Sequence, residues 1–106
     1  MLISKELLSK VLNRNILKIK IFSNCVGYFY DEKYDEINIF ELAHKCKEWL
    51  IEQTDNDIEI RSNKDVSIVS VYIKEEADFH FEYADMEIEA IFKACEWILK
   101  NKETKC

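Results

Sequence analysis

The chain has 106 residues, of which 48% are hydrophobic and 34% charged, and its net charge is −6. This length suits one hydrophobic core, so we expect a single compact domain over residues 1–106 with a flexible tail at 101–106. The acidic balance disfavours general nucleic-acid binding, because it repels phosphates. No apolar run approaches the roughly 18 residues of a membrane span, so no membrane association is expected.

The cysteines and the start of the chain indicate the compartment. The first six residues, Met-Leu-Ile-Ser-Lys-Glu, lack the pattern of an export signal. Without that signal, free and mostly buried thiols are favoured over two disulfides. We therefore expect a cytoplasmic protein with four unpaired cysteines: Cys25, Cys46, Cys95 and Cys106.

The first third of the chain predicts a helix and two strands. Residues 4–12 carry an apolar stripe with Ser4 placed to cap a short helix. Alternating residues at 16–22 predict a half-buried strand, and 25–30 a second one. The charged run 31–36 indicates a solvated loop. Three apolar side chains of the first strand are expected on one face: Leu17, Ile19 and Ile21.

The remaining elements are two longer helices and three short strands. Asn38 is placed to cap a helix reaching about residue 53. Its expected core stripe is Phe40, Ala43, Cys46 (or Lys47) and Leu50. The strands follow at about 57–61, 66–74 and 78–83. Asp85 then caps a last helix to about residue 101, and its expected core face is Ile88, Ile91, Cys95 and Ile98.

Short connections between these strands favour antiparallel pairing. We therefore predict an α+β fold: a five-stranded, mainly antiparallel sheet with two similar amphipathic helices packed on it and a short N-terminal helix. The two helices match at an offset of 48 residues, where Glu41, Lys45, Glu48 and Trp49 correspond to Glu89, Lys93, Glu96 and Trp97. Common helix-forming residues explain this match, and so does a ββα unit used twice.

No residue pattern points to catalysis, a cofactor or a metal. His44 and Cys46 are two apart on a helix and point about 200° away from each other, so they do not converge on an ion. His80 is expected to face outward, opposite Phe79 and Phe81. Gly27 is the only glycine, which excludes glycine-rich phosphate loops. We expect a protein that is not an enzyme.

Two groups of residues are candidates for binding. Acidic side chains and two tryptophans suit a basic protein partner: Asp31, Glu32, Asp35, Glu36, Glu75, Glu76, Trp49 and Trp97. Strand aromatics with nearby cations suit a nucleotide instead: Lys18, Lys20, Tyr28, Tyr30, Arg61 and Tyr72. Core packing competes with both, because alternation sends some rings inward and tryptophan also covers core edges.

The helix Ile-Asn-Ile-Phe-Glu-Leu-Ala-His-Lys-Cys-Lys-Glu-Trp, 37–49, and the stretch Tyr-Ala-Asp-Met-Glu-Ile-Glu-Ala-Ile-Phe-Lys-Ala-Cys-Glu-Trp-Ile-Leu, 83–99, resemble small phage and prophage proteins of the ABA-sandwich group. The resemblance covers roughly residues 36–100. The apolar β segment 16–31 departs from the group. The resemblance implies a phage-encoded accessory protein in a bacterial cytoplasm.

These observations lead to one functional expectation and two alternatives. The expectation is a small acidic binding protein that antagonises or modulates a host protein, for example a basic, nucleic-acid-binding defence effector such as a CRISPR nuclease. The first alternative is a nucleotide-binding sponge for a defence signalling molecule. The second is a structural homodimer.

Overall fold

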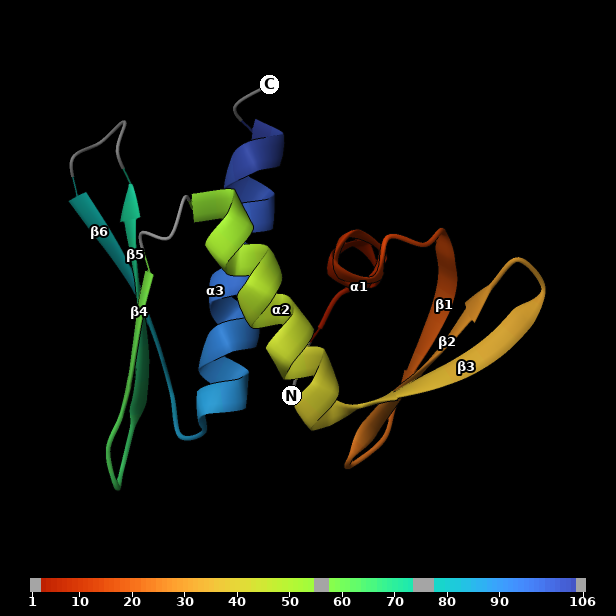
Figure 1. The fold of residues 1–106 in the computed structure, drawn as a ribbon, viewed down its shortest axis with the longest axis horizontal. Helices are drawn as coiled ribbons and strands as arrows, with labels where there is room; N and C mark the ends of the chain where they lie inside the picture. The colour runs from red at the N-terminus through yellow and green to blue at the C-terminus, as the bar shows by residue number, and fades with distance from the viewer. Residues whose placement is uncertain (1–2, 55–57, 74–77, 105–106) are drawn as a thin grey trace.

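The computed structural model describes residues 3–54, 58–73 and 78–104. Its three helices lie between two three-stranded antiparallel sheets, one at each end of a flat molecule of 44 × 38 × 18 Å (Figure 1). The elements are α1 (Lys5–Leu12), β1 (Ile16–Ile21), β2 (Cys25–Tyr30), β3 (Lys33–Asn38), α2 (Ile39–Thr54), β4 (Ile58–Ser62), β5 (Ser67–Ile73), β6 (Asp78–Ala84) and α3 (Glu87–Thr104). Within these ranges, no helix is both long and apolar enough to cross a membrane.

The fold is α+β, but the prediction of one five-stranded sheet is wrong. The described residues form two sheets, β1-β2-β3 and β4-β5-β6. The segment 31–36, expected to be a loop, contains a two-residue turn at Asp31-Glu32 and most of β3, which pairs with β2 from Cys25↔Asn38 to Tyr30↔Lys33. Each sheet is therefore a complete meander with its own covering helices. The two meanders do not share a strand pair, because the helices lie between them (Figure 1).

Each meander leads directly into a long helix, so the repeated unit is βββα rather than ββα. The helices α2 and α3 begin at Ile39 and Glu87, which are 48 positions apart. They pack side by side, and α3 also covers β5 and β6 (Figure 1). α3 continues to Thr104, into the segment expected as a tail, whose last residues 105–106 lie outside the described ranges.

Local capping explains where the first two helices begin. The Ser4 hydroxyl accepts a hydrogen bond from the Leu7 amide at 3.0 Å, as predicted. Asn38 Oδ1 accepts from the Phe40 amide at 2.8 Å, which confirms it as the α2 cap. Helix α1 ends where Asn13 adopts a left-handed conformation, with φ of 53°.

The core lies between the helices and the inner faces of both sheets. Two of the predicted sets of buried residues, in α2 and in β1, differ from those observed. In α2, Ala43, Cys46 and Leu50 are buried as predicted, but Phe40 is 67% exposed and Leu42 takes its place inside. In β1 a β-bulge between Ile16 and Lys18 leaves Leu17 exposed while Ile19 packs against the core.

The thiols divide into buried and accessible groups. Cys46 and Cys95 are fully buried where α2 meets α3, and the Cys95 thiol donates to the Cys46 carbonyl at 3.4 Å. Hydrogen bonding with the Cys46 side chain, together with burial, raises the pKa of Cys95 above its ordinary value. Cys25 is half-buried on sheet β1-β2-β3. Desolvation and the Glu36 carboxylate raise its pKa.

These environments predict the order of thiol reactivity. In a Cys106→Ser variant, we expect a disulfide reagent such as Ellman's reagent to modify Cys25 alone in the native protein and all three remaining thiols after unfolding. Because the raised pKa leaves less thiolate, native modification should be slow at pH 7 and accelerate toward alkaline pH. Glu36→Gln should accelerate it at pH 7. Rapid native modification of two or three thiols would contradict this assignment.

Candidate partner-binding groove

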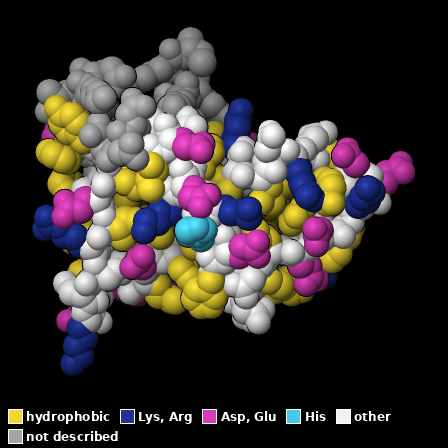
Figure 2. Space-filling view, in the orientation of Figure 1, with side chains coloured by type: hydrophobic (Ala, Val, Ile, Leu, Met, Phe, Trp, Pro, Cys, Tyr) yellow, Lys and Arg dark blue, Asp and Glu magenta, His cyan; other side chains and the backbone are white. Residues whose placement is uncertain are grey.

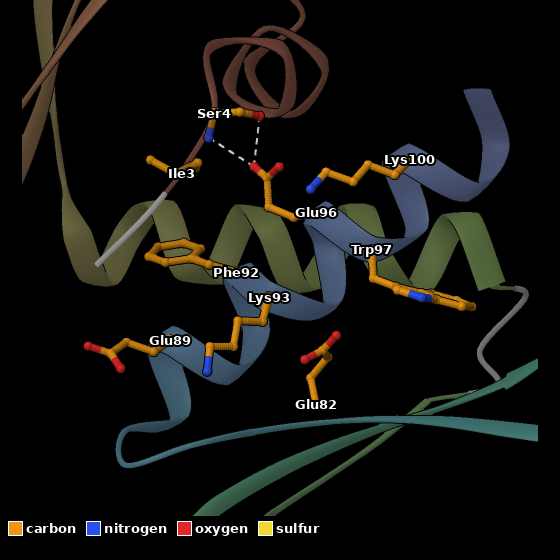
Figure 3. Close-up of a pocket in the computed structure, with 9 residues that line it drawn as sticks. All are labelled: Ile3, Ser4, Glu82, Glu89, Phe92, Lys93, Glu96, Trp97 and Lys100. Carbon is orange, nitrogen blue, oxygen red and sulfur yellow. Dashed lines mark hydrogen bonds between the residues drawn. The ribbon is translucent and has the colours of Figure 1, made fainter. Parts of the chain in front are cut away.

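A hollow of about 670 Å³ runs along α3. Its floor is one face of α3, because positions three and four apart in a helix share a face. One wall is the start of the chain before α1, and the other is β6 (Figure 3). We call it the α3 groove, and its lining residues are Ile3, Ser4, Glu82, Glu89, Phe92, Lys93, Glu96, Trp97 and Lys100.

The upper wall is held by a contact between the two ends of the described chain. Glu96 Oε1 accepts hydrogen bonds from the Ser4 amide at 2.8 Å and from the Ser4 hydroxyl at 2.7 Å (Figure 3). The same hydroxyl caps α1 through Leu7. Glu96 therefore fixes the start of α1 against α3 and determines the width of the groove on this side.

The lower wall depends on two polar residues of β6. The His80 ring stacks on Trp97, with centroids 3.7 Å apart and planes 9° from parallel. His80 Nε2 also lies 2.8 Å from Glu82 Oε1, and both side chains are only 25% exposed. Trp97 thus has one ring face covered by imidazole, while its position in the groove lining is fixed. The expectation that His80 faces outward is wrong.

The charges of the groove are mixed but lean acidic. Three carboxylates and two ammonium groups line it: Glu82, Glu89, Glu96, Lys93 and Lys100. Lys93 Nζ donates to the Tyr83 carbonyl at 2.9 Å, which directs its charge toward β6 (Figure 3). Among the described residues, no group of three or more His, Cys, Asp or Glu side chains is placed to hold a metal ion. The groove therefore combines apolar residues with one more carboxylate than ammonium group.

The acidic residues predicted to bind a partner do not form one patch. Asp31 and Glu32 occupy the tip of the β2–β3 hairpin with φ of 46° and 62°. Asp35 accepts from the Tyr28 hydroxyl at 3.4 Å, whereas Glu36 accepts from the Tyr34 hydroxyl at 2.9 Å, so adjacent carboxylates lie on opposite faces of β3. Residues Glu75 and Glu76 lie outside the described ranges.

The tip is unusual in its backbone. A two-residue hairpin with both residues at positive φ normally takes Asn-Gly, because only small or flexible residues adopt it cheaply. Here Asp31 and Glu32 hold the conformation with full side chains. Gly27 lies in β2, the strand that pairs with β3. The absence of a side chain there makes room for Tyr34 of β3, whose hydroxyl would collide with a Cβ at position 27.

The predicted tryptophans take similar positions with different neighbours. Both Trp49 and Trp97 are partly buried at the edge of the core. Only Trp97 lines the groove. The matched pair Glu48 and Glu96 also differ, because Glu48 pairs with His44 at 2.9 Å on the exposed face of α2. On the face of the molecule shown in Figure 2, acidic and basic side chains are interspersed rather than gathered into separate patches.

The predicted nucleotide-binding residues do not converge. Lys18 and Lys20 lie on the outer face of sheet β1-β2-β3, and Tyr28 and Tyr30 turn to its inner face. Arg61 and Tyr72 belong to the other sheet, beyond the helices (Figure 1). Tyr30 is further occupied by the Arg14 guanidinium, 4.3 Å from its ring centroid. The structure therefore gives these six residues no common site.

Sequence reasoning identified Trp97 but missed the rest of the groove. His80 and Glu82 alternate with aromatic residues, and that pattern alone does not say which set faces inward. The Ser4–Glu96 contact joins residues 92 positions apart. Comparisons with known protein families, curated proteins and solved structures find no match for this chain.

Proposed function

We propose that this chain is a non-enzymatic binding protein that holds a basic, partly apolar segment of a protein partner in the α3 groove. The observation that carries the proposal is the combination of three carboxylates with the Trp97 ring in one hollow of about 670 Å³. Volumes of roughly 300–1,000 Å³ are typical of specific binding pockets.

Each part of the groove suits such a segment. An arginine or lysine side chain is attracted by carboxylates such as Glu82 and Glu89 and by the face of an indole ring. The partly buried Trp97 offers apolar surface for its methylene groups and neighbours. The net charge of −6 adds long-range attraction for a basic partner.

The narrower proposal is that the partner is a host protein and the chain a phage-encoded antagonist of it. Its support is the resemblance of residues 36–100 to phage ABA-sandwich proteins together with the acidic charge. A basic, nucleic-acid-binding defence effector such as a CRISPR nuclease has the required chemistry. The nucleotide-sponge alternative has less support, because its residues lie on separate surfaces.

A direct test uses a defined peptide and variants of equal charge. The probe is a fluorescent dodecapeptide with arginine at every third position among leucine and alanine, measured by fluorescence anisotropy. We expect Glu82→Gln/Glu89→Gln to weaken binding about tenfold, since each lost charge pair contributes roughly 0.2–1 kcal/mol. Binding should also weaken as salt is raised.

The matched control is Glu48→Gln/Glu52→Gln on the exposed surface of α2, which changes the net charge equally. It should bind like the unmodified protein. Equal weakening in both double variants would show non-specific attraction, and no binding at 50 mM salt would refute the groove as a site for basic segments. Capture from bacterial lysate with the two double variants then identifies the natural partner by its dependence on Glu82 and Glu89.

A further inference from the structure

One face of sheet β4-β5-β6 is turned away from the helices (Figure 1), and the strand register arranges its residues in rows across the strands. The strand pairing places Glu59, Ser70 and Phe81 in one row, and Arg61, Ile68 and Tyr83 in the next. A last pair, Tyr72 and Phe79, has ring centroids 5.1 Å apart. We call these residues the outer face: Glu59, Arg61, Ile68, Ser70, Tyr72, Phe79, Phe81 and Tyr83.

In strand β6 the apolar side chains are exposed and the polar ones face inward, which is the reverse of the usual arrangement in a sheet with one solvated face. Phe79, Phe81 and Tyr83 are 54%, 46% and 53% exposed, and successive rings stack at 6.1 and 6.4 Å. The polar residues His80 and Glu82 face inward instead. An antiparallel sheet with one wet face normally buries its apolar side chains and exposes its polar ones. This reversal indicates that the outer face is covered when the protein acts.

The charge of the outer face identifies what covers it. Its two charged side chains neutralise each other, because Arg61 Nε donates to Glu59 Oε1 at 2.6 Å. Among the described residues of this face, a phosphate-rich ligand finds no cation beyond the one that Glu59 already holds, and a basic ligand finds no second carboxylate. The described part of the outer face is therefore electrically neutral on a chain of net charge −6, so repulsion between two copies of this acidic protein is weakest here.

We infer that the outer face binds the outer face of a second copy of this chain. Two-fold symmetry makes such a contact self-complementary, with the same residues on both sides. Ser70 is the smallest side chain of the array and lies directly across from Phe81. A two-fold axis between them places each Phe81 ring over the partner's Ser70. The aromatic residues then form the centre, and the Glu59–Arg61 pair lies at the rim, as in typical interfaces.

The exposed area sets the strength of this dimer. With roughly 200 Å² per aromatic side chain, the three β6 rings offer about 300 Å² on each copy. Adding the half-buried Ile68 and Tyr72 brings the total for two copies to roughly 700–900 Å², below the size of stable interfaces and in the range of weak, transient ones. We therefore expect a reversible dimer with a dissociation constant of about 10–100 μM. Screening of like charges should strengthen it as salt rises.

Sedimentation velocity over about 5–500 μM protein tests the inference. The unmodified chain should shift from monomer to dimer across this range. Phe81→Glu and Ser70→Glu each bury an unpaired carboxylate in the contact, and each should raise the dissociation constant at least about 100-fold. The control is Phe29→Glu, which places the same charge on an exposed phenylalanine of the other sheet and should leave the dimer unchanged. Circular dichroism checks that the variants fold.

Each other result overturns the inference. A monomer at 500 μM means that no second copy covers the face, and protection of Phe81 by single-stranded oligouridylate would then identify base stacking instead. A dimer that persists in both Phe81→Glu and Ser70→Glu uses another surface, such as the free edge of β6. Salt distinguishes this contact from the proposed groove function, because basic peptide binding weakens with salt whereas dimerisation strengthens. The Phe81→Glu monomer should still bind the arginine peptide.

Discussion

Replacing Phe92 with alanine is expected to lower the free energy of unfolding by about 3–5 kcal/mol, the largest effect of any substitution considered for this chain. Phe92 is 1% exposed and closes the floor of the α3 groove. Its removal leaves a cavity between α3 and the elements around it, because close-packed neighbours relax only partly. Urea unfolding followed by circular dichroism measures the loss as a lower midpoint with an unchanged slope.

The control for this experiment is Phe40→Ala. Phe40 lies at the position of α2 that corresponds to Ile88 in α3, yet 67% of it is exposed. We expect a change of about 0.5 kcal/mol or less. Phe92→Leu provides a milder substitution of the same sign if the alanine variant does not fold. Similar losses at Phe40 and Phe92 would contradict the arrangement of the two helices.

Removing the Glu96 carboxylate is expected to cost about 1–3 kcal/mol, because two donors of Ser4 lose a charged acceptor. Glu96→Ala should therefore lower the urea midpoint. It should also speed amide hydrogen exchange in α1, since the helix start is no longer held against α3. Glu96→Gln keeps an acceptor without the charge and should lie between the alanine variant and the unmodified protein.

The matched position in the other helix provides the control. Glu48 also precedes a tryptophan, at the matching position of α2, but it is 62% exposed and pairs with His44. Glu48→Ala removes the same charge and should change stability by about 0.5 kcal/mol or less. If both alanine variants lose the same stability, the Ser4–Glu96 contact does not hold α1. If Glu96→Ala lowers stability but does not speed amide hydrogen exchange in α1, then Glu96 stabilises the fold through other contacts of α3.

Local patterns determined most of the helical structure. Ser4 and Asn38 can be identified as helix caps from the sequence, because each has a side-chain oxygen directly before an apolar stripe. Such an oxygen accepts a hydrogen bond from one of the backbone amides that have no partner at a helix start. The buried positions Cys46 and Cys95 followed from helical spacing. The offset of 48 residues between the two helices is also visible in the sequence. Such features depend on residues within one or two turns, so no distant contact is needed to infer them.

Strand features were harder to infer, because strand pairing is not a local property. The polar sequence of β3 gave no apolar alternation, yet it pairs with β2 along its whole length. Its stability comes from backbone hydrogen bonds and cross-strand contacts such as Phe29 with Tyr34, whose ring centroids lie 4.8 Å apart. If β3 is taken as a loop, five strands remain, and five strands suggest one sheet rather than two.

Residue patterns are enough to infer an acidic α+β chain with a capped first helix and two similar long helices. The folded chain is needed to learn that the strands form two sheets, that His80 and Glu82 of β6 face inward, and that Ser4 contacts Glu96. Alternation in a strand defines two faces but does not say which one is buried. Only packing against α3 selects which face is buried, and that choice creates both the α3 groove and the exposed aromatic outer face.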